Sequence, residues 1–254
     1  MTKTLNNLRI LNTRPKAQAK DLKKAIEAEG GVALDCPALA IQELSFQTPD
    51  LNSLEIAIFV SSNAVHYFFK SLRSQNIPWP SSIAIVAVGH ATANALLHYN
   101  LRSSNIPKGC NSESLLAIEL LQQVKEKKIL LVKGEGGRTL IAETLVNRRA
   151  ELISLDVYKR VMPGYDSQYL QTLWQDKAVD IILFTSEQAM YNIFQMFGPS
   201  AHSWLCNTPC IVLSQRLAKA ASSLGMQRII ISKPEAILET LHQFNQGLIH
   251  GKQQ

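Results

Sequence analysis

The sequence predicts an α/β fold: two similar flavodoxin-like domains with parallel sheets, joined by two extended linkers with a cleft between them. Short, continuously apolar runs alternate with amphipathic stretches along all 254 residues. Uninterrupted apolar runs are typical of strands that are buried on both faces of a parallel sheet. Regular alternation of strands and helices indicates right-handed βαβ crossovers. Several elements also recur at a fixed spacing, which indicates a duplicated unit.

Nine apolar runs are predicted to be strands. They are residues 8–13, 31–36, 56–61, 83–88, 128–133, 151–158, 180–185, 210–214 and 228–232. The stretch after the first strand predicts a helix over residues 16–29, because Leu22 and Ile26 share one face and Gly30 follows as a helix-ending residue. Residues 113–124 and 139–150 have the same helical pattern.

The repeat has two spacings. An offset of 125 residues pairs Ser61 with Ser186 and Phe59 with Phe184, and an offset of 119 pairs Arg14 with Lys133. A duplicated α/β unit explains this agreement, while chance similarity among apolar strands remains the alternative.

Two divisions into domains fit the pattern. The first cuts the chain near residue 126 into sequential halves. The second uses the Pro-containing stretches 36–44 and 158–166 as linkers. It makes one domain from residues 1–37 and 162–254 and the other from residues 38–161, linkers included. The pattern alone does not choose between them.

Composition limits the class of partner. The net charge of +6 favours an anionic partner, but the chain has no run of five Lys or Arg and no interleaved aromatic and basic residues, so we expect no nucleic acid. No apolar run reaches the ~20 residues of a membrane span, and the N-terminus lacks the apolar core of a signal peptide. We therefore expect a cytoplasmic protein that does not bind a membrane.

Cysteine usage predicts reduced thiols and no metal site. The four cysteines are scattered through a long chain without an export signal. His202, Cys206 and Cys210 are spaced four apart, as metal ligands on one helix would be, but Pro209 interrupts the stretch and no fourth ligand is near.

Small polar and basic residues follow six of the predicted strands. In parallel α/β sheets ligands bind beyond the carboxyl ends of the strands, where helix N-termini attract anions. Each such Ser or Asn, taken alone, is most often a structural helix cap, yet six such turns suit a ligand with several carboxylates or phosphates. The resulting candidates for binding are Arg14, Ser61, Ser62, Asn63, Gly89, Thr92, Lys133, Gly134, Arg138, Ser186, Ser214 and Arg216.

The segment KGEGGRT (133–139) is glycine-rich between a strand and a helix. It lacks the Lys before Thr139 that a Walker A loop requires, and it is not G-x-G-x-x-G. We expect its glycines to let the backbone approach a ligand. Tyr158, followed by Lys159 and Arg160, is a candidate weak acid, with simple packing as the alternative.

Taken in order, several short motifs resemble the uroporphyrinogen-III synthase family over nearly the whole chain. They are Thr13-Arg14-Pro15, F-x-S-x-N-A-V (59–65), A-V-G-x-x-T-A (87–93), the helix start at 112–116, K-G-E-G-G-R-x-L (133–140), V-Y-K-R (157–160) and F-T-S (184–186).

The resemblance implies the discontinuous division of the chain and a cofactor-free cytoplasmic enzyme, which we expect to be monomeric. The implied substrate is hydroxymethylbilane, a linear tetrapyrrole with an acetate and a propionate on every ring, supplied by hydroxymethylbilane synthase. The implied reaction expels water and closes the ring through a spiro intermediate that inverts ring D.

The resemblance also implies roles for individual residues. Tyr158 would protonate the departing hydroxyl, and Ser61, Ser62, Thr92 and Ser186 match residues of the cleft. Ser112, in the helix start at 112–116, is a further candidate for substrate binding. Leu217 stands where the family often has threonine, so a hydroxyl role there cannot be carried over, while Arg216 would meet a carboxylate. The alternative function is a non-enzymatic, two-domain binder of a small polyanion.

Overall fold

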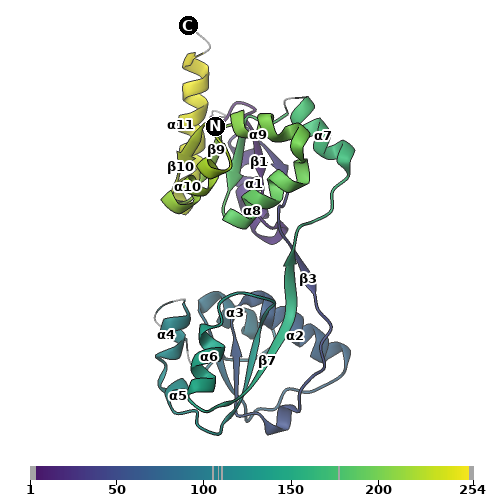
Figure 1. Cartoon of the computed structure of the whole chain (residues 1–254), viewed down its shortest axis with the longest axis vertical. Helices are drawn as coiled ribbons and strands as arrows, with labels where there is room; N and C mark the ends of the chain where they lie inside the picture. The colour runs from purple at the N-terminus through teal and green to yellow at the C-terminus, as the bar shows by residue number, and fades with distance from the viewer. Residues whose placement is uncertain (1–3, 105, 108, 110, 177, 252–254) are drawn as a thin grey trace. The chain divides into compact units, whose positions relative to one another are not determined.

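The chain forms two compact units, each with its own sheet (Figure 1). In this computed structural model, residues 4–251 are described except 105, 108, 110 and 177, and side chains are not described at 17 and 249–251. Unit 1 consists of Met1–Ala40 and Val161–Gln254, and unit 2 of Ile41–Arg160. None of the helices described combines the length and the apolar character needed to cross a bilayer.

Unit 1 contains a five-stranded sheet in the order β10-β9-β8-β1-β2. Its strands are β1 (Arg9–Asn12), β2 (Val32–Asp35), β8 (Ile181–Phe184), β9 (Cys210–Val212) and β10 (Ile229–Ile231). All four neighbouring pairs are parallel. Numbered along the unit, this is the order 2-1-3-4-5 of flavodoxin-like folds, which confirms the predicted fold class.

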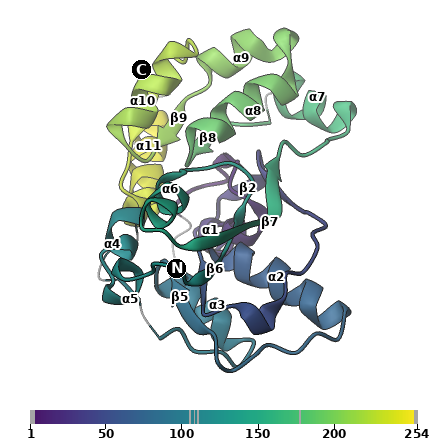
Figure 2. The same ribbon diagram turned by 60° about the horizontal axis from the view of Figure 1, so that its bottom comes forward.

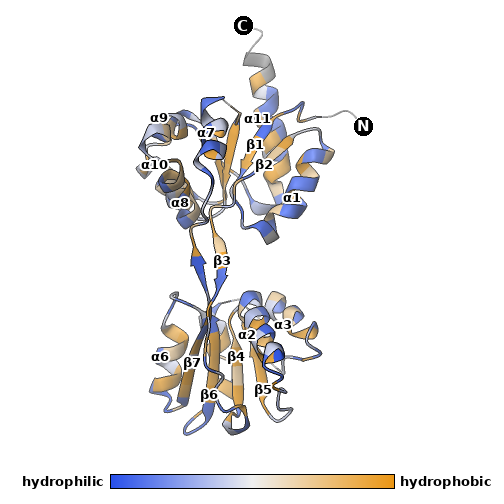
Figure 3. Ribbon diagram, turned by 90° about the vertical axis from the view of Figure 1, so that its right-hand side faces the viewer, coloured by the Kyte–Doolittle hydropathy of each residue, from blue (hydrophilic) through white to orange (hydrophobic). Residues whose placement is uncertain are grey.

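Helices cover both faces of the unit 1 sheet. They are α1 (Lys16–Ala28), α7 (Ser167–Gln175), α8 (Glu187–Phe197), α9 (His202–Asn207), α10 (Gln215–Ser223) and α11 (Ile237–Gly251), with 3₁₀ turns η2 (Pro199–Ala201) and η3 (Pro234–Ala236). One face packs against α1 and α11 through Ile26 and Leu241. The other face packs against α7, α8, α9 and α10, with Phe184 and Ile193 in its core. The strands of this sheet are accordingly mostly apolar (Figure 3).

Unit 2 contains a second five-stranded sheet, in the order β3-β7-β6-β4-β5. Its strands are β3 (Ala40–Glu43), β4 (Ile56–Phe59), β5 (Ala84–Ala87), β6 (Lys128–Gly134) and β7 (Glu151–Val161). Strands β7, β6, β4 and β5 take the places that β2, β1, β8 and β9 have in unit 1, as the repeat predicts. The fifth strand differs, because β10 extends the sheet beyond β9, whereas β3 lies at the opposite edge beside β7.

The helices of unit 2 also form two layers. They are α2 (Ser62–Ser74), α3 (His90–Leu97), α4 (Ser112–Leu116), α5 (Glu119–Gln122) and α6 (Leu140–Asn147), with the 3₁₀ turn η1 (Leu51–Ser53). Helices α2 and α3 pack on one face around Phe59 and Phe68, and α4, α5 and α6 pack on the other. Figure 2 shows α2 and α6 on opposite sides of this sheet.

The single helix predicted over 113–124 is wrong. The structure has two short helices, α4 and α5, separated by Ala117 and Ile118. Ile118 has extended backbone angles (φ −63°, ψ 132°) and packs against the same core cluster as Leu115 and Leu121. Tertiary packing of these apolar side chains therefore overrides the local helical pattern.

The buried thiols of unit 1 are expected to make this unit less stable as the pH becomes alkaline. Burial raises the pKa of both the Cys36 and the Cys210 thiol to about 12, whereas a thiol in the unfolded chain titrates near 8.5. Above about pH 9 the unfolded chain therefore loses protons that the folded chain retains. We expect the free energy of unfolding to fall by up to ~1.4 kcal/mol per pH unit and per thiol.

Denaturant unfolding of unit 1 at pH 8, 9 and 10 measures this loss. Cys210→Ala is the comparison, because it should unfold with a smaller pH dependence than the unchanged chain. Equal dependence of the free energy of unfolding on pH in the two proteins would contradict the raised thiol pKa values.

Among the described residues no group of three or more His, Cys, Asp or Glu is placed to hold a metal ion. Cys110 lies outside the described residues.

Candidate functional site

The same serine cap starts a helix in each unit. Ser61 Oγ accepts the Ala64 N–H at 3.0 Å at the start of α2, and Ser186 Oγ accepts the Ala189 N–H at 3.2 Å at the start of α8. The two pairs of residues differ by the same 125 positions. Both caps follow a buried strand, β4 or β8, so each helix begins at the carboxyl edge of its sheet. Helix N-termini at this edge favour anionic groups.

A pocket of about 510 Å³ lies at the carboxyl edge of the unit 2 sheet. It includes six of the predicted site residues, from the start of α2, from β6, β7 and α4, and from the glycine-rich loop. These six are Ser61, Ser112, Lys133, Gly134, Arg138 and Tyr158. The other lining residues are Val60, Val88, Asn111, Gly136, Gly137, Ile141 and Arg160. Donors and cations from separate segments thus meet around one concave surface.

Tyr158 lines this pocket and is almost completely buried. Its side chain is only 2% exposed, and its hydroxyl lies 3.1 Å from Ser61 Oγ, within hydrogen-bond distance. The centroid of its ring lies 6.0 Å from the centroid of the Tyr67 ring. The Arg160 guanidinium lies 5.8 Å from the centroid of the Tyr158 ring. A fixed phenol beside a cation and a helix N-terminus can give a proton and stabilise the phenolate that remains.

Three cations line the pocket, and two of them have carboxylate partners. Lys133 Nζ lies 2.7 Å from Asp156 Oδ1, and Arg138 Nη1 lies 3.0 Å from Glu113 Oε1. Arg160 makes no ion pair with a described residue. The pocket is therefore able to bind carboxylates through Arg160 directly, and through Lys133 and Arg138 in exchange for their present partners.

Four predicted residues of unit 2 lie outside this lining. Ser62 donates its hydroxyl to the Ala91 carbonyl at 3.0 Å, and Asn63 is exposed on α2. Gly89 starts α3 with an extended backbone (φ −177°). Thr92 is buried in the same helix, with 3% of its surface exposed.

Four of the predicted site residues lie at the carboxyl edge of the unit 1 sheet. They are Arg14, Ser186, Ser214 and Arg216. Arg14 lies two residues after the end of β1, and its Nε is buried without a hydrogen-bond partner. Burial lowers the pKa of this guanidinium, but arginine remains charged at neutral pH. An unpartnered buried donor next to a helix start is a place where an anionic group would be stabilised.

The starts of α8 and α10 are joined by an ion pair. Arg216 Nη1 lies 2.6 Å from Glu187 Oε2, and both residues are partly exposed. Ser214 Oγ accepts the N–H of Leu217 at 3.3 Å, and the Leu217 side chain is buried. Leu217 therefore donates its backbone N–H to the helix cap and packs its side chain in the core.

A second basic pocket, of about 410 Å³, lies along α1 of unit 1. Lys16, Lys20 and Lys23 line it together with Asp35 and Tyr165. Lys23 Nζ forms an ion pair with Asp35 Oδ2 at 3.0 Å.

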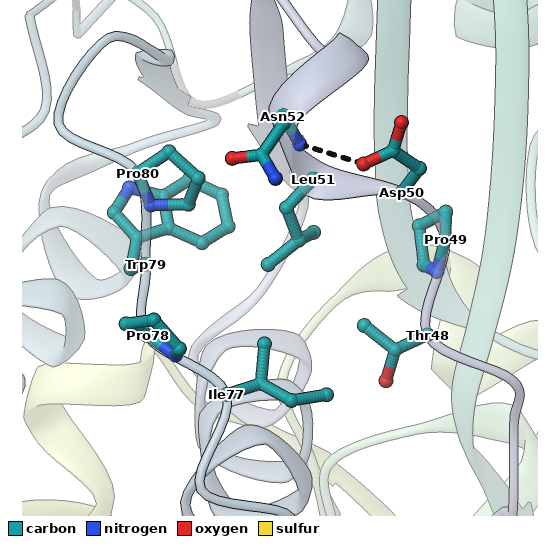
Figure 4. A pocket seen from close by; sticks show the side chains of 9 residues that line it. All are labelled: Thr48, Pro49, Asp50, Leu51, Asn52, Ile77, Pro78, Trp79 and Pro80. Atoms are coloured by element: carbon teal, nitrogen blue, oxygen red, sulfur yellow. Dashed lines mark hydrogen bonds between the residues drawn. The ribbon is translucent and has the colours of Figure 1, made fainter.

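A third pocket, of about 360 Å³, lies at the opposite edge of the unit 2 sheet (Figure 4). It is lined by the segments 48–52 and 77–80, which precede β4 and β5. Asp50 is its one charged lining residue, and its carboxylate accepts the Asn52 N–H at 3.1 Å. Without a cation this pocket does not suit a polyanion.

Comparison with protein families decides between the candidate classes of protein. The family model described as "Uroporphyrinogen-III synthase HemD" matches residues 20–239. The chain belongs to the uroporphyrinogen-III synthase family. It is therefore an enzyme of heme biosynthesis, a lyase.

Relatives in the uroporphyrinogen-III synthase family match most of the chain. The enzyme of Escherichia coli (strain K12) is 29% identical over 231 residues, covering 88% of this chain and 94% of its own. The Proteus mirabilis enzyme is 32% identical over 180 residues, covering 68% and 90%.

Solved structures agree with the fold. The Helicobacter pylori 26695 uroporphyrinogen-III synthetase matches with a TM-score of 0.60 at 16% identity, over 95% of this chain and 99% of its own. A mutant Thermus thermophilus enzyme matches with 0.57 at 16% identity, over 97% and 99%. At this identity the likeness supports the fold alone.

Sequence reasoning missed several residues that line the unit 2 pocket of this uroporphyrinogen-III synthase family member. Asn111 caps α4 by accepting the Ser114 N–H at 2.7 Å, and a polar residue before a helical run was the available signal. Arg160 was noted beside Tyr158 but was not assigned to the site. The apolar lining residues Val60, Val88 and Ile141 carried no signal, because apolar residues at strand ends and helix starts are also core residues.

Proposed function

We propose that this chain closes linear hydroxymethylbilane to uroporphyrinogen III, with loss of water and inversion of ring D, and that the two carboxyl edges bind the carboxylates of this substrate. The buried Tyr158 hydroxyl, held beside Ser61 in the lining of a cationic pocket, is the observation that carries the proposal. The family supplies the reaction, and the charges around the pocket match a substrate with many carboxylates.

Tyr158 acts as the general acid in this proposal. It gives its proton to the departing hydroxyl while the carbon–oxygen bond breaks, and water leaves. The pyrrole nitrogen lone pair supplies the electrons for this step, which leaves a cationic azafulvenium (an N-protonated azafulvene) and a phenolate. Ring closure and the spiro rearrangement then release a proton, which restores the tyrosine. The remaining task is to hold the chain in a curved pose, and positioning of this kind contributes a large share of many rate enhancements.

The decisive experiment is an isomer assay. Purified protein is incubated with hydroxymethylbilane, the products are oxidised, and isomers I and III are separated by chromatography. Spontaneous closure gives the symmetric isomer I, so we expect mostly isomer III with the protein present. A product ratio equal to that of the protein-free reaction would reject the proposal and leave a polyanion binder that performs no turnover.

Arg14 is proposed to bind a substrate carboxylate. Arg14→Gln should raise KM about tenfold, because a charge-assisted hydrogen bond is worth ~1.5–3 kcal/mol, and should change kcat by less than about twofold. Steady-state kinetics measure both constants.

Arg9→Gln is the matched control for Arg14. Arg9 lies at the other end of β1, where Nη2 lies 2.7 Å from Asp180 Oδ1. Its loss should lower stability and leave KM unchanged. If the two variants raise KM equally, Arg14 does not bind the substrate.

We further infer that the protein acts as a monomer in the cytoplasm and receives its substrate from hydroxymethylbilane synthase. The substrate closes spontaneously to the wrong isomer, so the enzyme that makes it must deliver it quickly. Sedimentation analysis tests the monomer. Mixing the two enzymes tests delivery, because diluting the second enzyme should raise the proportion of isomer I.

A further inference from the structure

We propose that Gly134 is a positioning residue for Tyr158. The missing side chain at position 134, together with a β-bulge, admits the tyrosine ring and fixes its hydroxyl beside the start of α2. The inference rests on the proposed function for the role of Tyr158 as the acid, while the packing relation can be tested without that role.

The bulge lies where β6 and β7 pair. Lys133 pairs with Asp156, but the next residue, Gly134, pairs with Tyr158, so Val157 has no partner in β6. Successive side chains of a regular strand point to opposite faces, and a bulge breaks this alternation. As a result, Val157 and Tyr158 both belong to the core cluster around Phe59 and Phe68, on the face covered by α2.

Hydrogen bonds on both sides hold the bulged backbone. The Val157 carbonyl accepts the Leu44 N–H at 3.1 Å, and the Tyr158 carbonyl accepts the Glu135 N–H at 2.8 Å. Both carbonyls of the bulge are thus satisfied. The direction of the Tyr158 side chain is therefore set by the backbone on either side of it.

Gly134 lies against the hydroxyl end of the Tyr158 ring. A Cβ at position 134 would lie 2.5 Å from Tyr158 Cζ and 2.9 Å from its Oη, closer than nonbonded carbon atoms approach. Its backbone does not have a positive φ, in contrast to Gly136 (φ 72°) and Gly137 (φ 84°). A Cβ at those two positions would meet nothing within 4 Å. Position 134 therefore needs glycine because of the tyrosine ring.

The sequence suggested that the glycines of this loop let the backbone approach a ligand. The structure gives Gly134 a different neighbour, the side chain of the proposed acid. An alanine at 134 requires the ring to move by roughly 1 Å to reach an ordinary contact distance. Displacements of this size can cost up to ~100-fold in rate, so we expect Gly134→Ala to lower kcat at least tenfold with KM changed less than twofold.

A kinetic double-mutant cycle separates positioning from other roles. The variants are Gly134→Ala, Tyr158→Phe and the two combined, all assayed for isomer III. If Gly134 acts only by placing the Tyr158 hydroxyl, its substitution costs nothing further once that hydroxyl is gone. A general loss of folded protein, or a clash with substrate, would instead multiply with the Tyr158→Phe loss. Gly164→Ala is the matched control, because a Cβ there meets nothing within 4 Å and its φ is not positive.

A wild-type kcat for Gly134→Ala, or losses that multiply in the double variant, would overturn the inference. If Gly134→Ala does not fold, the same substitution is made with Tyr158→Leu, which removes the ring. Recovery of a cooperative thermal transition then supports the inference, and failure to recover it overturns the inference. If the wild-type protein makes no isomer III, the proposed function is rejected. The packing relation is then still tested by melting temperatures, which show whether removing the Tyr158 ring restores the stability that Gly134→Ala loses.

Discussion

Replacing Tyr158 with phenylalanine should lower kcat for hydroxymethylbilane by about 100-fold, within the range that general acid catalysis contributes. The ring is 2% exposed and packs against Tyr67, so phenylalanine preserves the buried surface. Only the hydroxyl beside Ser61 is removed. Initial rates measure the loss, and the far-ultraviolet circular dichroism spectrum should not change.

The product of the slow Tyr158→Phe reaction is informative as well. Because the pocket still positions the tetrapyrrole, the turnover that remains should still give isomer III. Tyr99→Phe is the matched control, since the Tyr99 hydroxyl lies 3.3 Å from His66 Nδ1 in an exposed contact of the same unit. It should retain full activity. An unchanged kcat in Tyr158→Phe would show that another group donates the proton.

Replacing Phe59 with alanine should destabilise unit 2 by ~3–5 kcal/mol, as is usual for a fully buried aromatic residue. Phe59 is 0% exposed at the end of β4. Its ring centroid lies 5.6 Å from that of Phe68 and 5.5 Å from that of Phe69. Truncation therefore leaves a cavity among rings that cannot collapse without moving α2, and α2 carries the Ser61 cap.

Trp79 provides a specific measurement for Phe59→Ala. Its ring centroid lies 6.3 Å from that of Phe59, while Trp174 and Trp204 belong to unit 1. In a Trp174→Phe, Trp204→Phe background, fluorescence during urea unfolding therefore follows unit 2.

Leu97→Ala is the control for Phe59→Ala. Leu97 is 53% exposed on α3, and its truncation should change stability by less than ~0.5 kcal/mol. A loss below ~1 kcal/mol for Phe59→Ala would mean that the ring cluster is not the main core of this unit.

The fold was largely predictable because its strands are buried on both faces. Nine apolar runs become nine strands, since no polar alternation is needed when helices cover each side. Strand β3 was not predicted, because Gln42 and Glu43 are exposed at the sheet edge and its sequence resembles a linker. The break between α4 and α5 was missed because it depends on packing at Ile118 and not on local propensity.

The candidate site was predictable only where its geometry is local. Ser61, Ser186 and Ser214 each lie two residues after the end of a strand and cap the next helix, so residue order alone suggests their place. The contact between Ser61 and Tyr158 joins residues 97 positions apart. It also depends on the bulge opposite Gly134, which leaves no mark in the sequence. The pairing of Arg138 with Glu113 is equally non-local.

The discontinuity of unit 1 has a consequence on the ribosome. Strands β1 and β2 leave the exit tunnel first, but β8, the other neighbour of β1, begins only at Ile181. At a translation rate of ~5–20 residues per second, on the order of 10–30 s pass between the synthesis of β1 and the synthesis of β8. All of Ile41–Arg160 emerges in the meantime. The segment translated in the middle can therefore fold first. Until β8 is made, the apolar side chains of β1, β2 and one face of α1 lack their partners, so this part of the nascent chain is most in need of chaperone protection.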